Sequence, residues 1–258
     1  PYRHTYSSAA WGWQRMRAYY DLHIHSCLSP CGDKDMTPYN IAGMAKLCGL
    51  DIIALTDHNS CKNCPVFLRA VQQYGLCGVA GMELCTSEEI HVVCLFPTLA
   101  QAMRFDSYVY DHMMDIQNRE DIYGAQMIMD EQDQPAGREK KLLLTATDIS
   151  ISGLRTLVDT FGGVCFPAHI DRDSYSVLAA LGEIPPEEAY TCAEITEKGD
   201  IGALQAQHPG LKDMILLKNS DAHYLENIAA KRAWLELPEH SPAALISALK
   251  NGLIHWGR

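Results

Sequence analysis

The chain has 258 residues, 47% of them hydrophobic and 21% charged, which is typical of globular proteins. This length suits a single (β/α) barrel of roughly 250 residues, or at most two small domains. No apolar stretch reaches the roughly 18 residues of a membrane span, and no signal peptide is recognised. The net charge of -11 does not suit a surface that coats nucleic acid, which would be basic. We therefore expect a cytoplasmic protein that binds neither a membrane nor long nucleic acid.

Short apolar runs alternate with helical patterns from residue 18 onward. Thr37 followed by Pro38 predicts an N-cap and a first helical turn, and Gly49 predicts the end of that helix. Further helices are expected over residues 65–74, 152–161 and 241–252. Strands are expected at the apolar runs 19–22, 52–55, 92–96, 164–168, 193–195, 214–217 and 233–237. This alternation favours a parallel α/β sheet or barrel.

Residues 105–150 depart from the alternation and predict an insert. Residues 130–137 read as an exposed turn between the apolar segments 127–129 and 142–144, which predicts a β-hairpin. Residues 1–17 show little periodicity and are expected to be a tail or an expression remnant. The remaining residues, 18–258, are expected to form a single domain that carries the insert.

Histidine is unusually frequent, with 11 residues, and six of these lie at or beside the ends of apolar runs. The six are His23, His25, His58, His91, His169 and His223. His23 and His25 are two residues apart, so their side chains share one side of an extended strand, and Asp221 and His223 have the same spacing. In a parallel barrel the carboxyl ends of the strands open onto one face. Six imidazoles with carboxylates such as Glu83 exceed the ligands of one ion, so more than one zinc, manganese or iron ion is predicted.

Six short segments, in this order, resemble the PHP (polymerase and histidinol phosphatase) family of metal-dependent phosphoesterases. They are DLHIHS at 21–26, TDH at 56–58, GME at 81–83, EIH at 89–91, PAH at 167–169 and SDAH at 220–223. The resemblance implies a distorted seven-stranded (β/α) barrel with a trinuclear metal centre at its carboxyl-terminal face.

The resemblance also implies the metal ligands. The first metal would take His23, His25, Glu83 and Asp221. A second would share Glu83, together with His91 and His169, and a third would take His58 and His223. In relatives the third metal also takes a His or Asp five or six residues after the second His of the first motif. Pro30 and Cys31 stand there in this chain, so Cys31 or Asp33 is expected to substitute, unless the third metal is weak or absent.

Nine of the ten cysteines fall into two classes. Five lie in apolar surroundings and are expected to be reduced core residues: Cys48, Cys77, Cys94, Cys165 and Cys192. The loops after two of the histidine motifs carry the other four of interest: Cys27, Cys31, Cys61 and Cys64. These loops should be neighbours, so a zinc-thiolate site, a redox-sensitive disulfide or cluster, and cysteines without a special role all stay open.

Closely spaced divalent ions suit the hydrolysis of phosphate esters. We therefore expect a hydrolase that acts on a small phosphomonoester, a nucleotide or a short oligonucleotide. Arg172 resembles the family's phosphate-contacting residue, and a guanidinium group matches phosphate oxygens in a bidentate manner. Asp57 precedes a ligand histidine and is expected to orient it or to donate a proton to the leaving group. The alternatives are a metal-dependent amidohydrolase and a non-catalytic accessory domain that responds to metal or redox state.

Overall fold

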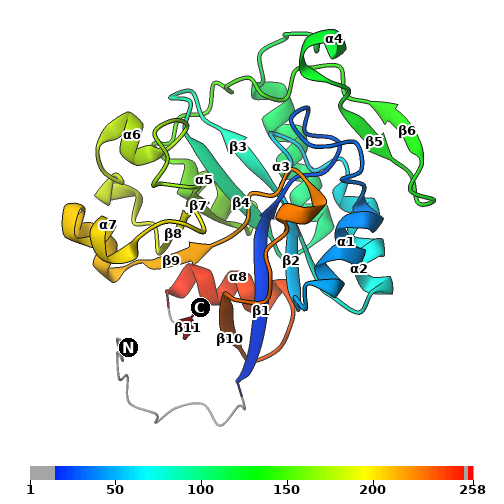
Figure 1. Ribbon diagram of the computed structural model, residues 1–258. Coiled ribbons are helices and arrows are strands. Elements are labelled where there is room, and N and C mark those ends of the chain that lie inside the picture. Colours follow the sequence, from blue (N-terminus) through cyan, green and yellow to red (C-terminus); the bar gives the residue numbers. More distant parts are fainter. Residues whose placement is uncertain (1–14, 253–254, 258) are drawn as a thin grey trace.

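Seven strands form one curled, mixed sheet, a half-barrel, at the centre of the molecule (Figure 1). The computed structural model describes residues 15–252 and 255–257. The strands of this sheet are β1 (Met16–Ile24), β2 (Ile52–Leu55), β3 (Cys77–Cys85), β4 (His91–Phe96), β7 (Val164–Pro167), β10 (Trp234–Leu237) and β11 (Trp256–Gly257). They are arranged in the order β11-β10-β1-β2-β3-β4-β7. The expected distorted barrel of PHP type is confirmed.

The alternation of strands and helices predicted a parallel sheet, but the sheet is mixed. β1, β2 and β3 are parallel, whereas β4 lies antiparallel to both β3 and β7, and β10 is antiparallel to β1. β3 and β4 are separated by only residues 86–90, too few for the helical crossover that a parallel connection needs. A separate parallel pair, β8 (Cys192–Ile195) and β9 (Ile215–Lys218), continues the wall beyond β7.

Helices flank the curled sheet (Figure 1). The α-helices are α1 (Pro38–Leu47), α2 (Cys64–Gln73), α3 (Leu99–His112), α4 (Glu120–Tyr123), α5 (Leu154–Thr160), α6 (Val177–Leu181), α7 (Ile201–Gln207) and α8 (Pro242–Asn251). The described residues also form three short 3₁₀ helices, η1 (Pro186–Glu188), η2 (Pro209–Asp213) and η3 (Leu225–Asn227). Among the described residues, no helix has the length and apolar character needed to cross a membrane.

Two hydrophobic clusters occupy the two faces of the sheet. The inner core lies within the curl and includes Tyr20, Leu22, Ile52, Ala54, Val79, Val93, Leu95, Phe166, Cys192 and Leu217. The outer core packs under the helices and includes Ile24, Ile53, Leu55, Ala80, Met82, Val92, Cys94, Phe67 and Phe105. Alternate residues of each strand therefore enter different clusters, as the pleat requires. Helix α8 contributes Leu245, Ile246 and Leu249 to the inner core.

The insert differs from the expectation in two respects. Its boundary at residue 105 falls inside α3, which begins at the N-cap Thr98 and is a regular part of the fold. The hairpin consists of β5 (Met127–Met129) and β6 (Pro135–Arg138), so the prediction of a second strand at 142–144 is wrong. The Asp130 side chain accepts hydrogen bonds from the backbone N–H groups of Gln132 and Gln134 and closes the turn early. The apolar run instead enters the core, where Leu142 and Leu143 are buried.

The expected tail, residues 1–17, lies largely outside the described residues, which begin at residue 15. Met16 and Arg17 belong to β1, where they pair with Leu237 and Glu236 of β10.

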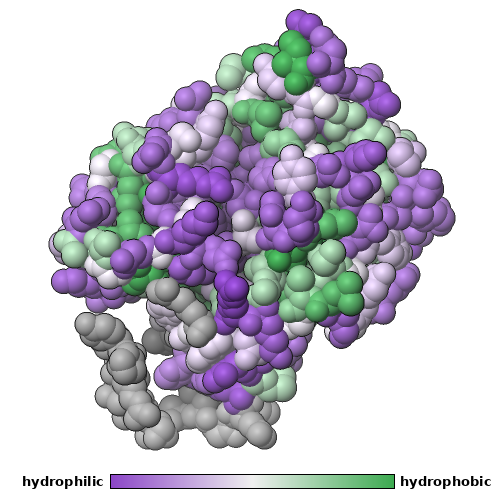
Figure 2. Space-filling view, in the orientation of Figure 1, coloured by the Kyte–Doolittle hydropathy of each residue, from purple (hydrophilic) through white to green (hydrophobic). Residues whose placement is uncertain are grey.

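Figure 2 shows that hydrophilic residues cover most of the face seen in Figure 1. Hydrophobic residues gather over α4 and between α6 and α7. The region between α6 and α7 contains a cavity of about 550 Å³, lined in part by Leu178, Ile184 and Leu211.

The hairpin is fastened to the barrel through the fully buried Asn63. Its side-chain amide donates to the Met127 carbonyl oxygen and to Ser26 Oγ, and its Oδ1 accepts from the Met129 N–H. Ser26 belongs to the loop that follows the first two histidines. The insert therefore braces one of the loops that carry the expected metal ligands.

Replacing Asn63 with Ala is expected to lower the free energy of unfolding by roughly 2–4 kcal/mol, because each buried polar group left unpaired costs about 1–3 kcal/mol. The control is Asn251→Ala, at an exposed position on α8, which should change stability by about 0.5 kcal/mol or less. Urea unfolding measures both effects, and hydrogen exchange should show faster exchange of the β5 and β6 amides in the Asn63 variant. Equal stability of the two variants would contradict the bracing role.

Candidate metal centre

Plain strand alternation directs four functional side chains into the curl of the sheet. Glu83 follows Val79 at intervals of two along β3, and His91 stands two residues before Val93 of β4. His58 extends the same alternation beyond β2, and Glu194 lies two residues after Cys192 in β8. All four continue the inner-core side of their strands toward one end of the barrel.

A bulge in β1 brings in the first two histidines. Leu22 belongs to the inner core but Ile24 to the outer core, so the faces of the strand exchange between them. The pairing of β1 with β2 shifts register in the same place, between Asp21 and Ile24. Because one extra residue moves every later side chain to the other face, His23 and His25 lie on the same side as Leu22.

Two further side chains of the site belong to residues whose backbone is in the left-handed region. Ala168 belongs to the inner core, so continued alternation would point His169 outward, but its φ of 29° turns the side chain back toward the site. Asp221 has a φ of 51° in the loop after β9, so the extended geometry expected for Asp221 and His223 is not present. Such backbone costs about 1–3 kcal/mol in a residue other than glycine and is typical of functional sites.

The result is a buried cluster around the Glu83 carboxylate. His23 Nε2 and His25 Nε2 are 3.1 Å apart, and each lies 3.3 Å from a Glu83 oxygen. Asp221 Oδ1 lies 3.3 Å from His23 Nε2 and 3.2 Å from His25 Nε2. These four side chains can direct one ligand atom each at a common point. They are the set that the resemblance to the PHP family implied for a first metal.

Two more groups of ligand atoms adjoin the first. His58 Nδ1 and His91 Nδ1 each lie 2.9 Å from Glu83, and the three side chains form a second group. His169 Nε2 lies 3.1 Å from Glu83 Oε1, beside that group. The third group brings His25 together with His58 and His223, with the rings of His25 and His223 stacked at 4.2 Å. Among the described residues, neither Cys31 nor Asp33 joins any of these groups.

The donor set fits divalent cations. Glu83 Oε2, Asp221 Oδ1 and His169 Nδ1 are buried without a hydrogen bond. Burial opposes ionisation of Glu83, but His91 and His23 outweigh it and hold the pKa of Glu83 well below its usual range. Burial lowers the pKa of His58 to about 3 and that of His223 to about 4, so both imidazoles are neutral at physiological pH. Ionised carboxylates and imidazoles are the ligands that zinc, manganese and iron accept.

Glu194 is a functional residue that the sequence reasoning missed. Its carboxylate accepts a hydrogen bond from His23 Nδ1 at 2.9 Å, from the His169 N–H at 3.0 Å and from Asn219 Nδ2 at 2.7 Å. Because this bond holds the ring proton of His23 on Nδ1, the lone pair of Nε2 is left free to bind a metal ion. The signal in the sequence was a single carboxylate inside an apolar strand, on its inward side.

Asp57 is almost fully buried beside the cluster, with 1% of the residue exposed. Its carboxylate accepts hydrogen bonds of 2.7 Å from the Ser26 N–H, Ser26 Oγ and Ser29 Oγ. Ser29 Oγ also lies 2.9 Å from His25 Nδ1. Asp57 is therefore connected to His25 through one hydroxyl group.

Arg172 reaches the cluster from the loop after β7. Its guanidinium forms an ion pair of 2.8 Å with Asp221 Oδ2, while 45% of the side chain stays exposed. The Arg172 side chain thus lies between solvent and the first group of ligand atoms.

The four loop cysteines do not converge. Cys61 and Cys64 are fully buried, and both Sγ atoms contact the Gly81 carbonyl oxygen, at 3.1 and 3.5 Å. Cys27 Sγ is also buried and faces the Met127 carbonyl oxygen, whereas Cys31 is exposed. All four thiols are free, and none belongs to a group of potential metal ligands among the described residues.

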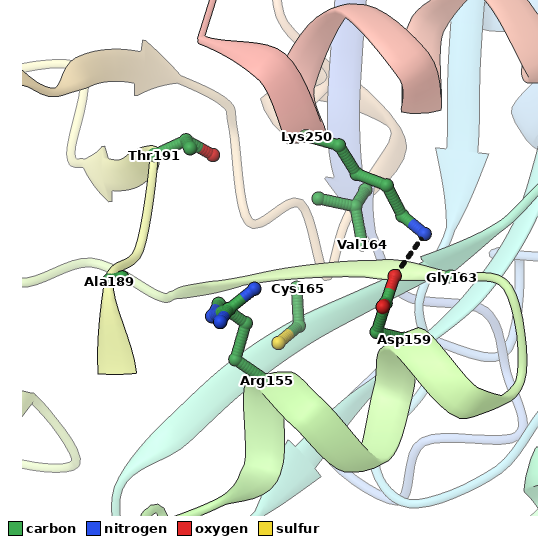
Figure 3. Close-up of a pocket in the computed structure, with 8 residues that line it drawn as sticks. All are labelled: Arg155, Asp159, Gly163, Val164, Cys165, Ala189, Thr191 and Lys250. Carbon is green, nitrogen blue, oxygen red and sulfur yellow. Dashed lines mark hydrogen bonds and ion pairs between the residues drawn. The ribbon is translucent and has the colours of Figure 1, made fainter. Parts of the chain in front are cut away.

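A cavity of about 230 Å³ lies at the other ends of β7 and β8 (Figure 3). Val164 and Thr191, near the starts of these strands, line it together with residues of α5 and α8. Two of the lining residues, Asp159 and Lys250, form an ion pair of 2.5 Å. None of the predicted site residues lines this cavity, so it is separate from the histidine cluster.

Solved structures share this fold. The lesion-specific endonuclease PfuEndoQ of Pyrococcus furiosus is 19% identical, with a TM-score of 0.66 over 93% of this chain and 58% of that chain. A Bifidobacterium adolescentis protein assigned by inference to the metal-dependent phosphoesterases is 16% identical, with a TM-score of 0.52 over 82% of this chain and 92% of that chain. An amidohydrolase of Chromobacterium violaceum is 17% identical, with a TM-score of 0.52 over 82% of this chain and 90% of that chain.

An uncharacterised protein of Methanocaldococcus jannaschii is 33% identical over 76 residues, which cover 26% of this chain and 44% of that protein. This chain therefore spans less than two thirds of both the Methanocaldococcus protein and the Pyrococcus endonuclease.

The family model of the PHP domain matches residues 21–240, a range that holds every residue of the histidine and carboxylate cluster. The chain belongs to the PHP domain family.

Proposed function

We propose that this chain is a metal-dependent phosphoesterase that hydrolyses a small phosphate ester, such as a phosphomonoester, a nucleotide or a short oligonucleotide. The observation that carries the proposal is the Glu83 carboxylate, which contributes to two adjoining groups of ligand atoms. A bridging carboxylate suits closely spaced divalent ions of zinc, manganese or iron. The metal-dependent hydrolases among its structural relatives support the same reaction class.

The ligands are assigned from the contacts of each side chain. His23, His25, Glu83 and Asp221 would hold the first ion, and Glu83 with His91 and His169 a second. His58 and His223 would hold a third, and among the described residues neither Cys31 nor Asp33 is grouped with these two histidines. His58 Nδ1 lies 2.9 Å from Glu83 Oε2, so His58 stands between the second and third groups.

When bound, such ions activate water near neutral pH and neutralise charge on the attacking and leaving oxygens. The residues of the chain would bind the substrate and orient the metal ligands. Arg172 would bind two phosphate oxygens at the open side of the cluster, with a guanidinium group that already lies over Asp221. Glu194 would fix the ring of His23. Asp57, whose carboxylate is occupied by Ser26 and Ser29, would orient His25 through Ser29.

A small substrate is favoured over long nucleic acid because of the net charge of -11. Binding to long nucleic acid depends on many Lys and Arg contacts to phosphates. The Pyrococcus endonuclease acts on damaged nucleic acid with a chain of which this one spans 58%. Lesion-containing duplex DNA therefore belongs in the substrate panel as the competing class.

The first test is hydrolysis of a panel of phosphomonoesters, nucleotides, oligonucleotides and lesion-containing DNA by the manganese-loaded protein. Glu83→Gln removes a charged ligand shared by two groups, so both bound manganese and kcat/KM should fall by more than about 100-fold. The exposed Glu187→Gln variant is the control and should behave as the wild type. A fully metallated wild type that hydrolyses none of the small esters would refute the proposal.

The second test concerns Glu194. Replacement by Gln keeps the shape but removes the charge that fixes His23 Nδ1–H, so manganese affinity should fall by about 10–100-fold. Glu197→Gln, three residues along the chain at an exposed position, should leave the affinity unchanged. Competition with a chelator of known affinity measures both. Unchanged affinity in the Glu194 variant would remove it from the metal centre.

The third test separates phosphoester from amide chemistry at Arg172. Arg172→Ala should lower kcat/KM for a phosphate ester by roughly 10–100-fold, because hydrogen bonds to a charged group are worth about 1.5–3 kcal/mol. Bound manganese should not change, and the exposed Arg232→Ala is the control. Hydrolysis of an uncharged amide, insensitive to Arg172→Ala, would instead identify an amidohydrolase.

A further inference from the structure

An aromatic ring lies on one of the proposed metal ligands. The ring of Tyr175 stacks on the imidazole of His91, with centroids 4.7 Å apart and planes inclined by 26°. His91 Nδ1 lies in turn 2.9 Å from Glu83 Oε1. The Tyr175 ring is therefore one imidazole away from the centre of the cluster. Tyr175 is nevertheless 50% exposed, so it remains accessible from solvent.

The backbone holds Tyr175 in this place at a conformational cost. Its φ of 55° is in the left-handed region, which is rare for a bulky residue. The His91 N–H donates to the Tyr175 carbonyl oxygen at 3.0 Å, which ties the loop to the start of β4. Burial of apolar surface does not account for this arrangement, because half of the residue is exposed. Strain of this kind, in a segment held by the surrounding structure, points to a functional placement.

The same loop carries Arg172, three residues earlier. The Arg172 N–H donates to the His169 carbonyl oxygen at 2.9 Å, and Ser176 Oγ donates to the Arg172 carbonyl oxygen at 2.7 Å. These bonds fix the loop at both ends. The loop therefore presents a guanidinium group over Asp221 and an aromatic ring over His91, on two parts of one cluster.

We propose that Tyr175 is a specificity-determining residue, which stacks on a planar ring that the substrate carries at a spacer's length from its phosphate. The inference rests on the proposed function, in which the phosphate lies at the cluster beside Arg172. Because the Tyr175 ring is separated from Glu83 by the His91 imidazole, a ring attached directly to the phosphate would fall short of it. A spacer the size of a sugar spans this interval, so the substrate class is a phosphate ester of a sugar that bears a planar heterocycle.

The chemistry of the exposed Tyr175 ring, which we call the stacking platform, fits this substrate class. Aromatic side chains stack on planar heterocycles in an offset arrangement and tolerate differences among them, because each heterocycle presents a π-face. Such a residue selects for the presence of a ring more than for its identity.

A second role for Tyr175 would be purely structural, to hold the His91 ring in place. The two roles differ in what they affect. A platform changes only the binding of ligands that carry a planar ring. A support for His91 changes the binding of metal and of every phosphorylated ligand alike.

The test measures equilibrium binding of two hydrolysis-resistant ligands to the manganese-loaded protein. These are the methylene phosphonate analogues of adenosine 5′-monophosphate and of ribose 5-phosphate, and the second carries a hydroxyl group in place of the base. The wild type should bind the adenosine analogue about fivefold to 100-fold more tightly than the ribose analogue. Tyr175→Phe should keep this preference, whereas Tyr175→Ala and Tyr175→Leu should abolish it without changing bound manganese or affinity for the ribose analogue.

Three results would overturn the assignment. One is equal affinity of the wild type for the two analogues, and another is no binding of either. The third is an equal loss of both affinities, or of manganese, in Tyr175→Ala. Failure of the proposed function gives a different result. The protein would then hydrolyse no phosphate ester but would still prefer the adenosine analogue in a manner that depends on Tyr175. This result would support the role of Tyr175 and refute the hydrolase.

Discussion

The structure depends on one buried charge, the carboxylate of Glu83. Only 1% of this residue is exposed, and imidazole nitrogens of five histidines lie 2.9–3.3 Å from its oxygens. A buried carboxylate is stable only when positive charge compensates it, whether carried by protons on the imidazoles or by cations. The strands that converge at this end of the barrel place the histidines around the Glu83 carboxylate. Cations bound there would displace protons, so metal binding and acidity are linked at this centre.

Around this charge lies a second set of polar groups that sets the direction of each ring. Glu194 and Asn219 come from the ends of β8 and β9, and Ser29 with Asp57 comes from the loops after β1 and β2. Among the described residues, the barrel therefore closes at this end through polar contacts and the isolated bridge between Ile24 and Ala222, not through a continuous ladder of strands. The same polar contacts therefore orient the histidine rings and close this end of the barrel.

Much of the fold could be predicted because its signals are local. Apolar runs that end in histidine marked the strand ends, and the N-cap and glycine pairs marked helices such as α1. The strand β4 was predicted, but its antiparallel direction was missed because the direction of a strand does not follow from its own residues, although the short link 86–90 excluded a crossover. The polar strand β6 was missed because every residue in it is exposed. Glu194 escaped notice because its partners, His23 and His169, are 171 and 25 residues away.

The bulge in β1 makes the length of that strand matter as much as its composition. Its extra residue, between Asp21 and Ile24, is what brings His23 and His25 onto the inner face beside Leu22. An insertion or deletion here would exchange the two faces beyond that point and turn both imidazoles toward the helices, with every ligand still present in the sequence. Tolerance of this segment to change should therefore be asymmetric, with conservative replacement of its apolar residues accepted and any change of spacing rejected.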